Sequence, residues 1–285
     1  AVAATAAVQW YVAESDICMF PSIGDLSLNR VTRSVMENAA RAVAAMAEGR
    51  AGAQVVNDAP PLIGVSSFGG TAACVDRVTE RLVESGYEVI HFHASGPGGR
   101  ALESLSAAGE LAGVIDITTH ELTDLIVDGV YSAGEGRLKS AGAAGLPQVV
   151  IPGSLDHANF WVGAVPEKFA EREFFQYNAQ NILMRTDAAE FLALGKLVAE
   201  RVNAARGPVS IMIPTRGYSE HTKRMAHDLD GGETGPWKQP EIDAVFVETL
   251  RAHLANAKLV ELDAHINDSE FSDACVAEFL TMMNR

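Results

Sequence analysis

Tyr87-Glu-Val-Ile-His-Phe-His-Ala-Ser-Gly-Pro-Gly-Gly-Arg-Ala-Leu-Glu103 is the stretch that decides the fold. Its first half alternates apolar and polar residues, which is typical of a mostly buried strand. Gly96, Gly98 and Gly99 then let the backbone turn sharply and leave its amides uncovered by side chains. A helix that begins there directs free N–H groups and a positive dipole end at a ligand. The stretch predicts a strand, an anion-binding turn and a helix, and a strand–helix connection without a ligand is the alternative.

Strand-like and helix-like segments alternate on both sides of this stretch. The expected strands are 62–65, 87–93, 113–117, 148–151, 209–213 and 259–262, and the expected helices are 28–47, 74–85, 101–108, 121–127, 137–144, 188–205, 241–254 and 270–283. Short strands alternating with helices predict an α/β fold, a Rossmann-like three-layer sandwich with a parallel sheet of about six strands. A polar, proline-terminated segment near residue 55 indicates a linker. We therefore expect residues 1–55 to be the tail of a preceding α/β subdomain with its linker, and 56–285 to be a Rossmann-like ligand-binding domain.

The composition excludes several classes of protein. The chain has 285 residues, of which 48% are hydrophobic, and a net charge of −15. Nucleic acid is therefore not an expected partner, because phosphate backbones require clustered Lys and Arg. Cys18, Cys74 and Cys275 are too widely spaced to indicate a disulfide framework or a zinc site. No apolar run reaches the length of a membrane span, so we expect a cytoplasmic protein with no membrane partner.

Polar residues gather at the ends of the expected strands. In a doubly wound sheet, ligands bind outside the carboxyl ends of the strands, where the strand order reverses. Some of these residues have a simpler role as helix caps, Thr71 before 74–85 and Thr118 or Thr119 before 121–127. The others predict one cleft that is shared with the glycine loop. Its expected members are Asp116, Thr118, Glu121, Asp156, Asn159, Arg185 and His265.

The residue types suggest two roles within this cleft. Residues expected to bind the ligand are Gly69, Thr71, Gly96, Gly98, Gly99, Arg100, Asp116, Thr118, Thr119, Glu121, Asn159 and Arg185. Residues expected to act as acids or bases are Asp156, His265 and Asp268. The alternative for Asp156 and Asn159 is that they only order the long segment 153–181, which lacks clear periodicity. Functional side chains should face solvent, whereas loop-ordering side chains should be buried and fully hydrogen-bonded.

Several motifs occur together and in a fixed order. They are Phe68-Gly69, His93-Ala-Ser-Gly-Pro-Gly-Gly-Arg100, Asp116-Ile-Thr-Thr-His-Glu121, Gly153-Ser-Leu-Asp-His-Ala-Asn-Phe160, Met184-Arg-Thr186 and His265-Ile-Asn-Asp268. In this order they resemble the uncharacterised bacterial family related to the ATP-binding amino-terminal domain of the tomato mosaic virus resistance protein. The resemblance runs from about Glu14 to the carboxyl terminus. It implies two Rossmann-like subdomains, a homodimer, and ATP, with or without Mg²⁺, at a cleft or subunit interface.

The chain also departs from the pattern of that family. The family's preceding subdomain, with its own Gly-rich loop, does not occur here, and residues 1–50 resemble only its tail. Where the family has Phe-Gly-Val-Thr-Thr-Pro-Cys, this chain has Phe68-Gly-Gly-Thr-Ala-Ala-Cys74. A polar insertion that reaches Pro240 follows Arg216. If the missing loop holds the nucleotide phosphates, this chain alone does not bind ATP.

Two classes of function remain open. The first is a nucleotide-binding protein, whose phosphate ligand is held by the Gly-rich strand–helix loop. The second is a metabolic enzyme that acts on a phosphorylated or carboxylated small molecule through Asp and His acid–base residues. No metal is expected, because His91 and His93 lack compact ligand spacing with other residues, and no Gly-x-Ser-x-Gly elbow supports a Ser/His/Asp hydrolase. A β-branched residue at Gly98 is expected to block the ligand and leave the fold intact.

Overall fold

The computed structural model describes residues 2–3, 12–22, 28–51 and 59–284, and it divides into two units, 1–59 and 60–285. In the smaller unit, β1 (Val2–Ala3) pairs in parallel with β2 (Phe20–Pro21). The helix α2 (Arg30–Ala51) follows, and it continues four residues beyond the predicted end at 47. The side chain of Asn29 accepts hydrogen bonds from the amides of Val31 and Thr32, at 2.9 and 3.1 Å, and so caps its first turn.

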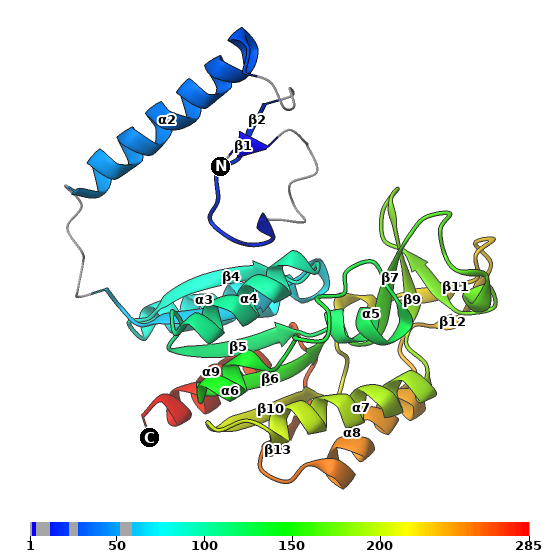
Figure 1. Cartoon of the computed structure of the whole chain (residues 1–285). Coiled ribbons are helices and arrows are strands. Elements are labelled where there is room, and N and C mark those ends of the chain that lie inside the picture. The colour runs from blue at the N-terminus through cyan, green and yellow to red at the C-terminus, as the bar shows by residue number, and fades with distance from the viewer. Residues whose placement is uncertain (1, 4–11, 23–27, 52–58, 285) are drawn as a thin grey trace. The chain divides into compact units, whose positions relative to one another are not determined.

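The larger unit is built on a six-stranded sheet in which every pair of neighbours is parallel (Figure 1). The strand order is β13-β10-β6-β5-β3-β4. Their bounds are β3 (Leu62–Ser67), β4 (Glu88–His93), β5 (Gly113–Thr118), β6 (Gln148–Gly153), β10 (Val209–Pro214) and β13 (Lys258–Leu262). The predicted parallel sheet of about six strands is confirmed, and each predicted strand overlaps an observed one.

Helices cover both faces of this sheet, as the predicted three-layer sandwich requires (Figure 1). One face is covered by α3 (Ala72–Glu84) and α9 (Ser269–Met283). The other carries α4 (Pro97–Ala108), α5 (Glu121–Val127), α6 (Ser140–Ala144), α7 (Ala188–Asn203) and α8 (Pro240–His253). Successive residues of a strand point to opposite faces, so Val149 and Ile151 pack with α3 and α9 while Val150 packs with α7 and α8.

The strand order reverses next to β3, the first strand of the sheet. The chain passes from β3 through α3 to β4 at the sheet edge, and then returns through α4 to β5 on the other side of β3. The loops after β3 and β5 therefore lead to opposite faces of the sheet. A ligand crevice is expected between such loops, and here they contain the short turn η1 (Gly69–Thr71) and residues 119–120.

A second, antiparallel sheet was not predicted from the sequence. It has the order β12-β11-β8-β9-β7 and lies at the carboxyl end of the main sheet (Figure 1). Its strands are β7 (His157–Trp161), β8 (Phe174–Gln176), β9 (Asn181–Arg185), β11 (Met225–His227) and β12 (Glu233–Pro236). The long segment after β6 and the polar insertion after β10 pair with each other in this sheet, through Phe174 and His227. Strands of three to five residues give too short a pattern for periodicity to reveal.

Candidate functional site

The glycine loop between β4 and α4 holds an anion from its own chain. The amides of Gly96 and Gly99 both donate to Oε1 of Glu121, at 2.7 and 3.2 Å. Glu121 is fully buried, and its other oxygen accepts from Nε of Arg137 at 2.7 Å. Burial raises the pKa of Glu121, and the charge of Arg137 opposes that shift. The amides that were predicted to bind a phosphate are therefore already hydrogen-bonded to the carboxylate of Glu121.

Arg137 extends this contact into a buried ionic network. Its guanidinium donates to both oxygens of Asp116, at 2.5 and 2.6 Å, in a bidentate pair. Ser66 donates to Asp116 at 2.6 Å, and Glu103 lies 3.5 Å from Arg137. Both Asp116 and Arg137 are at most 1% exposed. A ligand that displaced one of these carboxylates would leave a buried charge unpaired, which is strongly destabilising. The network therefore holds the loop in place.

The role expected for the neighbouring Gly98 also needs correction. A Cβ on Gly98 would lie 1.9 Å from the carbonyl oxygen of His93, so the strand–helix connection itself requires glycine there. The expectation that a β-branched residue at Gly98 would leave the fold intact is wrong. The side chain of Arg100 is exposed, and its Nη1 lies 3.6 Å from the Cβ position of Gly96. Its predicted contact with a ligand phosphate stays a prediction.

The base of the crevice between the loops after β3 and β5 is closed by side chains. Thr71 and Thr118 are hydrogen-bonded through their hydroxyls at 2.7 Å, and both are buried. The rings of Phe68 and His120 pack with centroids 4.3 Å apart. Neither Thr71 nor Thr119 caps a helix. The hydroxyl of Thr71 lies against Phe68 O and Thr118, and the amide of Cys74 in the first turn of α3 donates to Asn267 instead. The cap position of α5 is His120, and the hydroxyl of Thr119 donates to Ile151. The predicted caps were wrong because tertiary contacts use these hydroxyls instead.

Asp156 and His265, two of the predicted acid–base residues, converge on Ser219. Ser219 donates its hydroxyl to Asp156 at 2.8 Å, and its carbonyl oxygen lies 3.0 Å from Nε2 of His265. Asp156 is also bonded to Trp237 Nε1 at 2.9 Å and to His157 Nδ1 at 3.2 Å. Burial alone would raise the pKa of Asp156, but the contact with His157 and nearby positive charge hold it below its usual value. A carboxylate with three side-chain partners and 1% exposure acts by positioning its neighbours.

The remaining predicted residues lie in separate contacts at the same edge of the sheet. Asn159 bonds to Asp124 through its amide nitrogen and its side chain, at 2.7 and 2.9 Å. Arg185 pairs with Asp243 and donates to three backbone carbonyls. Asp268 is half exposed, pairs with Arg216 at 2.6 Å and accepts from the amide of His265. Asn159 on β7 and Arg185 on β9 belong to the second sheet, are buried, and do not line an open cleft.

A row of histidine rings crosses the space between the two sheets. His120 stacks on His157 with ring centroids 5.7 Å apart, and His157 meets His221 edge-on at 5.4 Å. Both ring nitrogens of His120 and Nε2 of His157 are buried without a partner among the described residues. Burial lowers the pKa of His221 to about 4 and that of His120 well below its usual range. His120 and His221 are therefore neutral at pH 7. The buried hydroxyl of Ser154 nearby also has no described partner, and its backbone φ is +58°.

Two hollows open beside the turn Gly69–Thr71. One, of 320 Å³, is lined by Ser67, Phe68, Gly69, Ala72, Val75, Asp76, His91 and His93. The other, of 220 Å³, is lined by Gly69, Gly70, Phe175, Tyr177, Glu220, His221 and Arg224. Gly69 borders both, and His91 and His93 line the same hollow because they are two residues apart on β4. A Cβ on Gly70 would lie 3.0 Å from Ser154 Oγ and 3.5 Å from His221 Nε2, so the glycine leaves these polar atoms uncovered.

The sequence did not single out several residues of this site. Arg137, Ser219, His221 and Trp237 were missed, because each lies far along the chain from its partners. His120 and His157 stand inside quoted motifs, beside Thr119 and Asp156, and that position was the available signal. Burial raises the pKa of Cys74 to about 12, so this thiol is a buried apolar residue and no activated nucleophile.

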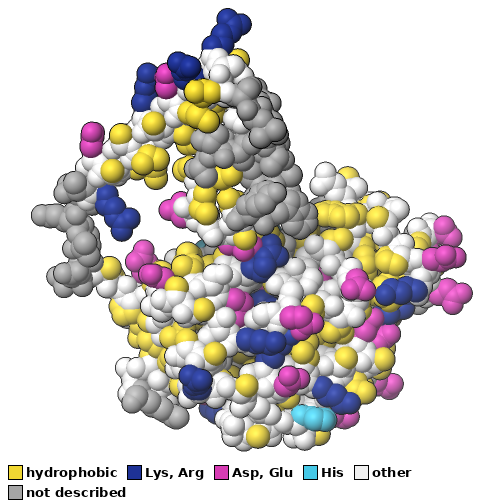
Figure 2. All heavy atoms as spheres, in the orientation of Figure 1, with side chains coloured by type: hydrophobic (Ala, Val, Ile, Leu, Met, Phe, Trp, Pro, Cys, Tyr) yellow, Lys and Arg dark blue, Asp and Glu magenta, His cyan; other side chains and the backbone are white. Residues whose placement is uncertain are grey.

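Three further observations limit what the described residues can bind. No group of three or more His, Cys, Asp or Glu among them is placed to hold a metal ion. None of the described helices has the length and apolar character to cross a bilayer. On the face shown in Figure 2, Lys and Arg are interspersed with Asp and Glu and form no continuous basic patch.

Comparison with known proteins places this chain in a family. Residues 60–283 match the C-terminal domain of the uncharacterised protein family UPF0261, and residues 1–52 match its N-terminal domain. The chain belongs to this family. A UPF0261 protein of Mesorhizobium japonicum is 42% identical over 275 residues, which are 95% of this chain and 66% of the relative. The ToMV resistance protein Tm-1 of Solanum lycopersicum is 36% identical over 278 residues, 95% of this chain and 36% of that protein.

The family match confirms the resemblance that the motifs predicted. The chain spans just under two thirds of the Mesorhizobium relative, so the activity and partners of the whole protein are matters for proposal. Among solved structures, a thioesterase domain from the curacin biosynthetic pathway has a TM-score of 0.36 and 10% identity. That match covers 78% of this chain and 92% of the other. A likeness this distant carries no argument about function.

Proposed function

We propose that this chain binds a nucleotide, ATP, with its phosphates on the turn Gly69–Thr71 and the start of α3. The supporting observation is that this turn lies where the strand order reverses, borders both hollows, and leads into α3, where Thr71 gives no side-chain cap and Asn267 binds the amide of Cys74 at 3.3 Å. Uncapped amides at a helix start favour anions through hydrogen bonds and the helix dipole. The glycine loop after β4 lacks this property, because Glu121 occupies it.

The two hollows suit the two halves of such a ligand. The hollow beside Gly70 offers Arg224 and His221 to the phosphates, and an exposed guanidinium can bind a phosphate with two hydrogen bonds. The hollow beside Phe68 offers an aromatic wall, since Phe68 stacks on His93 with centroids 5.3 Å apart. Asp76 in the same hollow is an acceptor for ribose hydroxyls. Mg²⁺ would bind through the phosphate oxygens of ATP. A homodimer and a cytoplasmic location stay predictions from the sequence.

Calorimetric titration with ATP and Mg²⁺ tests this proposal. In the variant Gly69→Val the Cβ meets the hydroxyl end of Tyr177, which can move, and the side chain covers the turn, so we expect the fold to persist and ATP affinity to fall at least about tenfold. Gly136→Val is the matched control, because a Cβ there meets nothing within 4 Å. Equal ATP affinity in Gly69→Val and Gly136→Val, or no ATP binding by the unmodified chain, would sink the proposal.

A second candidate function is an enzyme of acid–base type acting on a phosphorylated or carboxylated small molecule. Asp156 at Nδ1 of His157 would hold that ring with Nε2 as a proton acceptor, and Nε2 has no partner among the described residues. ³¹P NMR of ATP incubated with the chain separates the two functions. Unchanged ATP supports binding alone, whereas turnover that is lost in His157→Asn supports the enzyme.

A further inference from the structure

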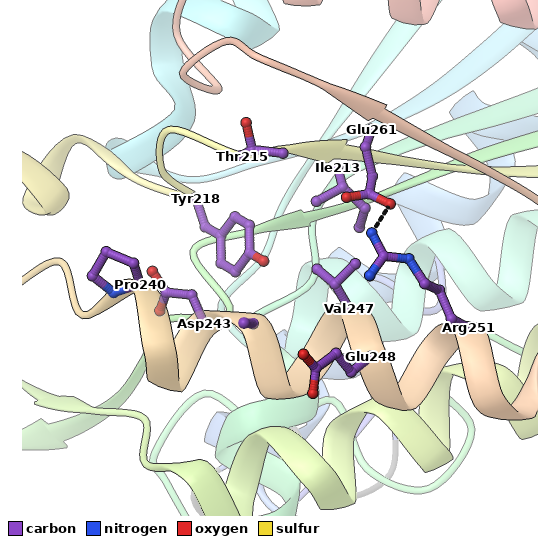
Figure 3. Close-up of a pocket in the computed structure, with 10 residues that line it drawn as sticks. Ile213, Thr215, Tyr218, Pro240, Asp243, Val247, Glu248, Arg251 and Glu261 are labelled. Atoms are coloured by element: carbon purple, nitrogen blue, oxygen red, sulfur yellow. Dashed lines mark hydrogen bonds and ion pairs between the residues drawn. The ribbon is translucent and has the colours of Figure 1, made fainter.

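A third cavity lies at the carboxyl ends of β10 and β13, beside α8 (Figure 3). Its volume is 220 Å³, and none of its lining residues borders the two hollows of the proposed nucleotide site. Ile213, Val247 and the ring of Tyr218 form its apolar floor. Pro240 and Ala244 of α8 extend this apolar surface toward the rim. Because an apolar cavity of about 150 Å³ holds a benzene molecule, this one has room for a ligand of one ring.

The hydroxyl of Tyr218 is a hydrogen-bond donor that opens into this cavity. Tyr218 is only 4% exposed, and its ring packs against Phe191 and Phe246. Its hydroxyl forms no hydrogen bond within the part of the chain that the structure describes, and Figure 3 shows its oxygen directed toward the space beside Val247. Burial, with a smaller contribution from the charge of Asp243, raises the pKa of Tyr218, so the hydroxyl keeps its proton. Buried tyrosine hydroxyls usually have a partner, and a ligand in the cavity can supply it.

The charged side chains around the cavity balance each other. The acidic residues of the lining are Asp243, Glu248 and Glu261. The bases beside them are Arg251, Arg185 and Lys238. Arg251 pairs with Glu261 (Figure 3), and Arg185 pairs with Asp243. Lys238 donates to the carbonyl oxygen of Thr215 in the lining at 2.8 Å and also interacts with the charge of Asp243. A charged ligand of either sign therefore gains no net attraction from these side chains.

We propose that this cavity binds a small neutral carbonyl compound with an apolar body. The hydroxyl of Tyr218 donates a hydrogen bond to the carbonyl oxygen of the ligand, and the apolar body covers Ile213 and Val247. A hydrocarbon of the same shape would cover the same floor but would leave the buried hydroxyl without an acceptor, which costs free energy. This site does not depend on nucleotide binding and is tested separately.

The probes are acetophenone and α-methylstyrene, in ligand-observed NMR titrations of the unmodified chain. The two molecules have nearly the same shape, and a C=CH₂ group in α-methylstyrene replaces the C=O group of acetophenone. Only acetophenone can accept a hydrogen bond from the hydroxyl of Tyr218. We expect saturable binding of acetophenone, and its absence would overturn the proposal.

A change at Tyr218 tests the hydrogen bond. Tyr218→Phe keeps the packed ring and removes only the hydroxyl. We expect acetophenone to bind this variant about fivefold more weakly than it binds the unmodified chain, and α-methylstyrene to bind it no more weakly. Titrating both probes against both chains separates the hydrogen bond from any other effect of the substitution. An equal change in affinity for the two probes would contradict the proposal.

A second pair of variants locates the binding. Ala244 is exposed on α8 and lines the cavity, so Ala244→Leu fills the cavity from a surface position and keeps a good helix former there. Ala252→Leu makes the same change at an exposed position of α8 outside the lining and is the matched control. We expect Ala244→Leu to bind acetophenone at least about tenfold more weakly than Ala252→Leu does. Equal affinities of these two variants would overturn the assignment to this cavity.

Discussion

Two glycine-containing turns connect strands to helices at the same edge of the sheet, and they differ in what their amides meet. After β4, the amides of Gly96 and Gly99 hold Glu121, which is locked by the buried Arg137. After β3, Gly69 and Gly70 border two hollows, and the N-cap residue of α3, Thr71, makes no side-chain cap, although Asn267 binds the amide of Cys74. The turn after β4, which has more glycines, therefore stabilises the fold. The turn after β3 is the one that we propose binds a ligand. Glycine content alone does not distinguish an anion site from a turn that an internal carboxylate has filled.

The largest expected effect comes from removing the internal anion. Glu121→Ala leaves Arg137 unpaired and the amides of Gly96 and Gly99 without their acceptor, so we expect the free energy of unfolding to fall by about 3–5 kcal/mol. Urea denaturation measures this change. A decrease in the free energy of unfolding below about 1 kcal/mol would mean that Glu121 does not hold the turn after β4 in place.

Lowering the pH should destabilise the fold through His221, which lies beside the turn Gly69–Thr71. The pKa of His221 is lowered from 6.5 to about 4 in the folded chain, so the unfolded chain binds more protons between these values. The contribution of neutral His221 to the free energy of unfolding should therefore be fully present above pH 6.5 and be lost as the pH drops toward 4, by about 3 kcal/mol. His120 shifts in the same direction and adds to the loss. Urea unfolding at pH 7 and pH 5 should show a smaller difference in His221→Gln than in the unmodified chain, and an unchanged difference would contradict the assignment.

The two turns should also respond differently to one added methyl group. In Gly98→Ala the Cβ meets the carbonyl oxygen of His93 at 1.9 Å, and we expect about 1–3 kcal/mol of destabilisation. In Gly69→Ala the Cβ meets the hydroxyl of Tyr177 at 2.6 Å, and this flexible end can move. Thermal unfolding of the two variants should therefore rank Gly98→Ala well below Gly69→Ala, and the reverse ranking would break the comparison.

The smallest expected effect is on ATP affinity, when Arg224 beside Gly70 is replaced. Arg224→Gln removes one exposed cation from the hollow beside Gly70, and ATP affinity should fall about fivefold, since an exposed ionic contact contributes about 1 kcal/mol. Lys196→Gln, an exposed cation on α7 outside both hollows, is the matched control. The loss in Arg224→Gln should shrink in high salt. Equal affinities of the two variants would exclude Arg224 from the site.

The local pattern of the chain was enough to predict the main sheet. Strands of this sheet are specified by residues close together in the sequence. The alternating residues before His93 and the β-branched run 148–151 are two examples, and both lie in strands. The second sheet was not predicted because its strands are short, and because one of its pairings joins Phe174 to His227, 53 residues along the chain. Glu121 was predicted to bind the ligand, but it binds the amides of Gly96 and Gly99 and the side chain of Arg137 instead. Its partner Arg137 lies 16 residues away and has no local signature.

The most direct test of the account is an NMR titration of the chain labelled with ¹⁵N-glycine, in which ATP and Mg²⁺ are added in steps. Glycine amides report the two turns separately within one experiment. The account predicts saturable shifts of the Gly69 and Gly70 amide resonances, while those of Gly96 and Gly99 stay bound to Glu121 and do not move. Shifts of the Gly96 and Gly99 amide resonances, with those of Gly69 and Gly70 unchanged, would contradict it. That result would mean that the phosphates bind to the loop after β4.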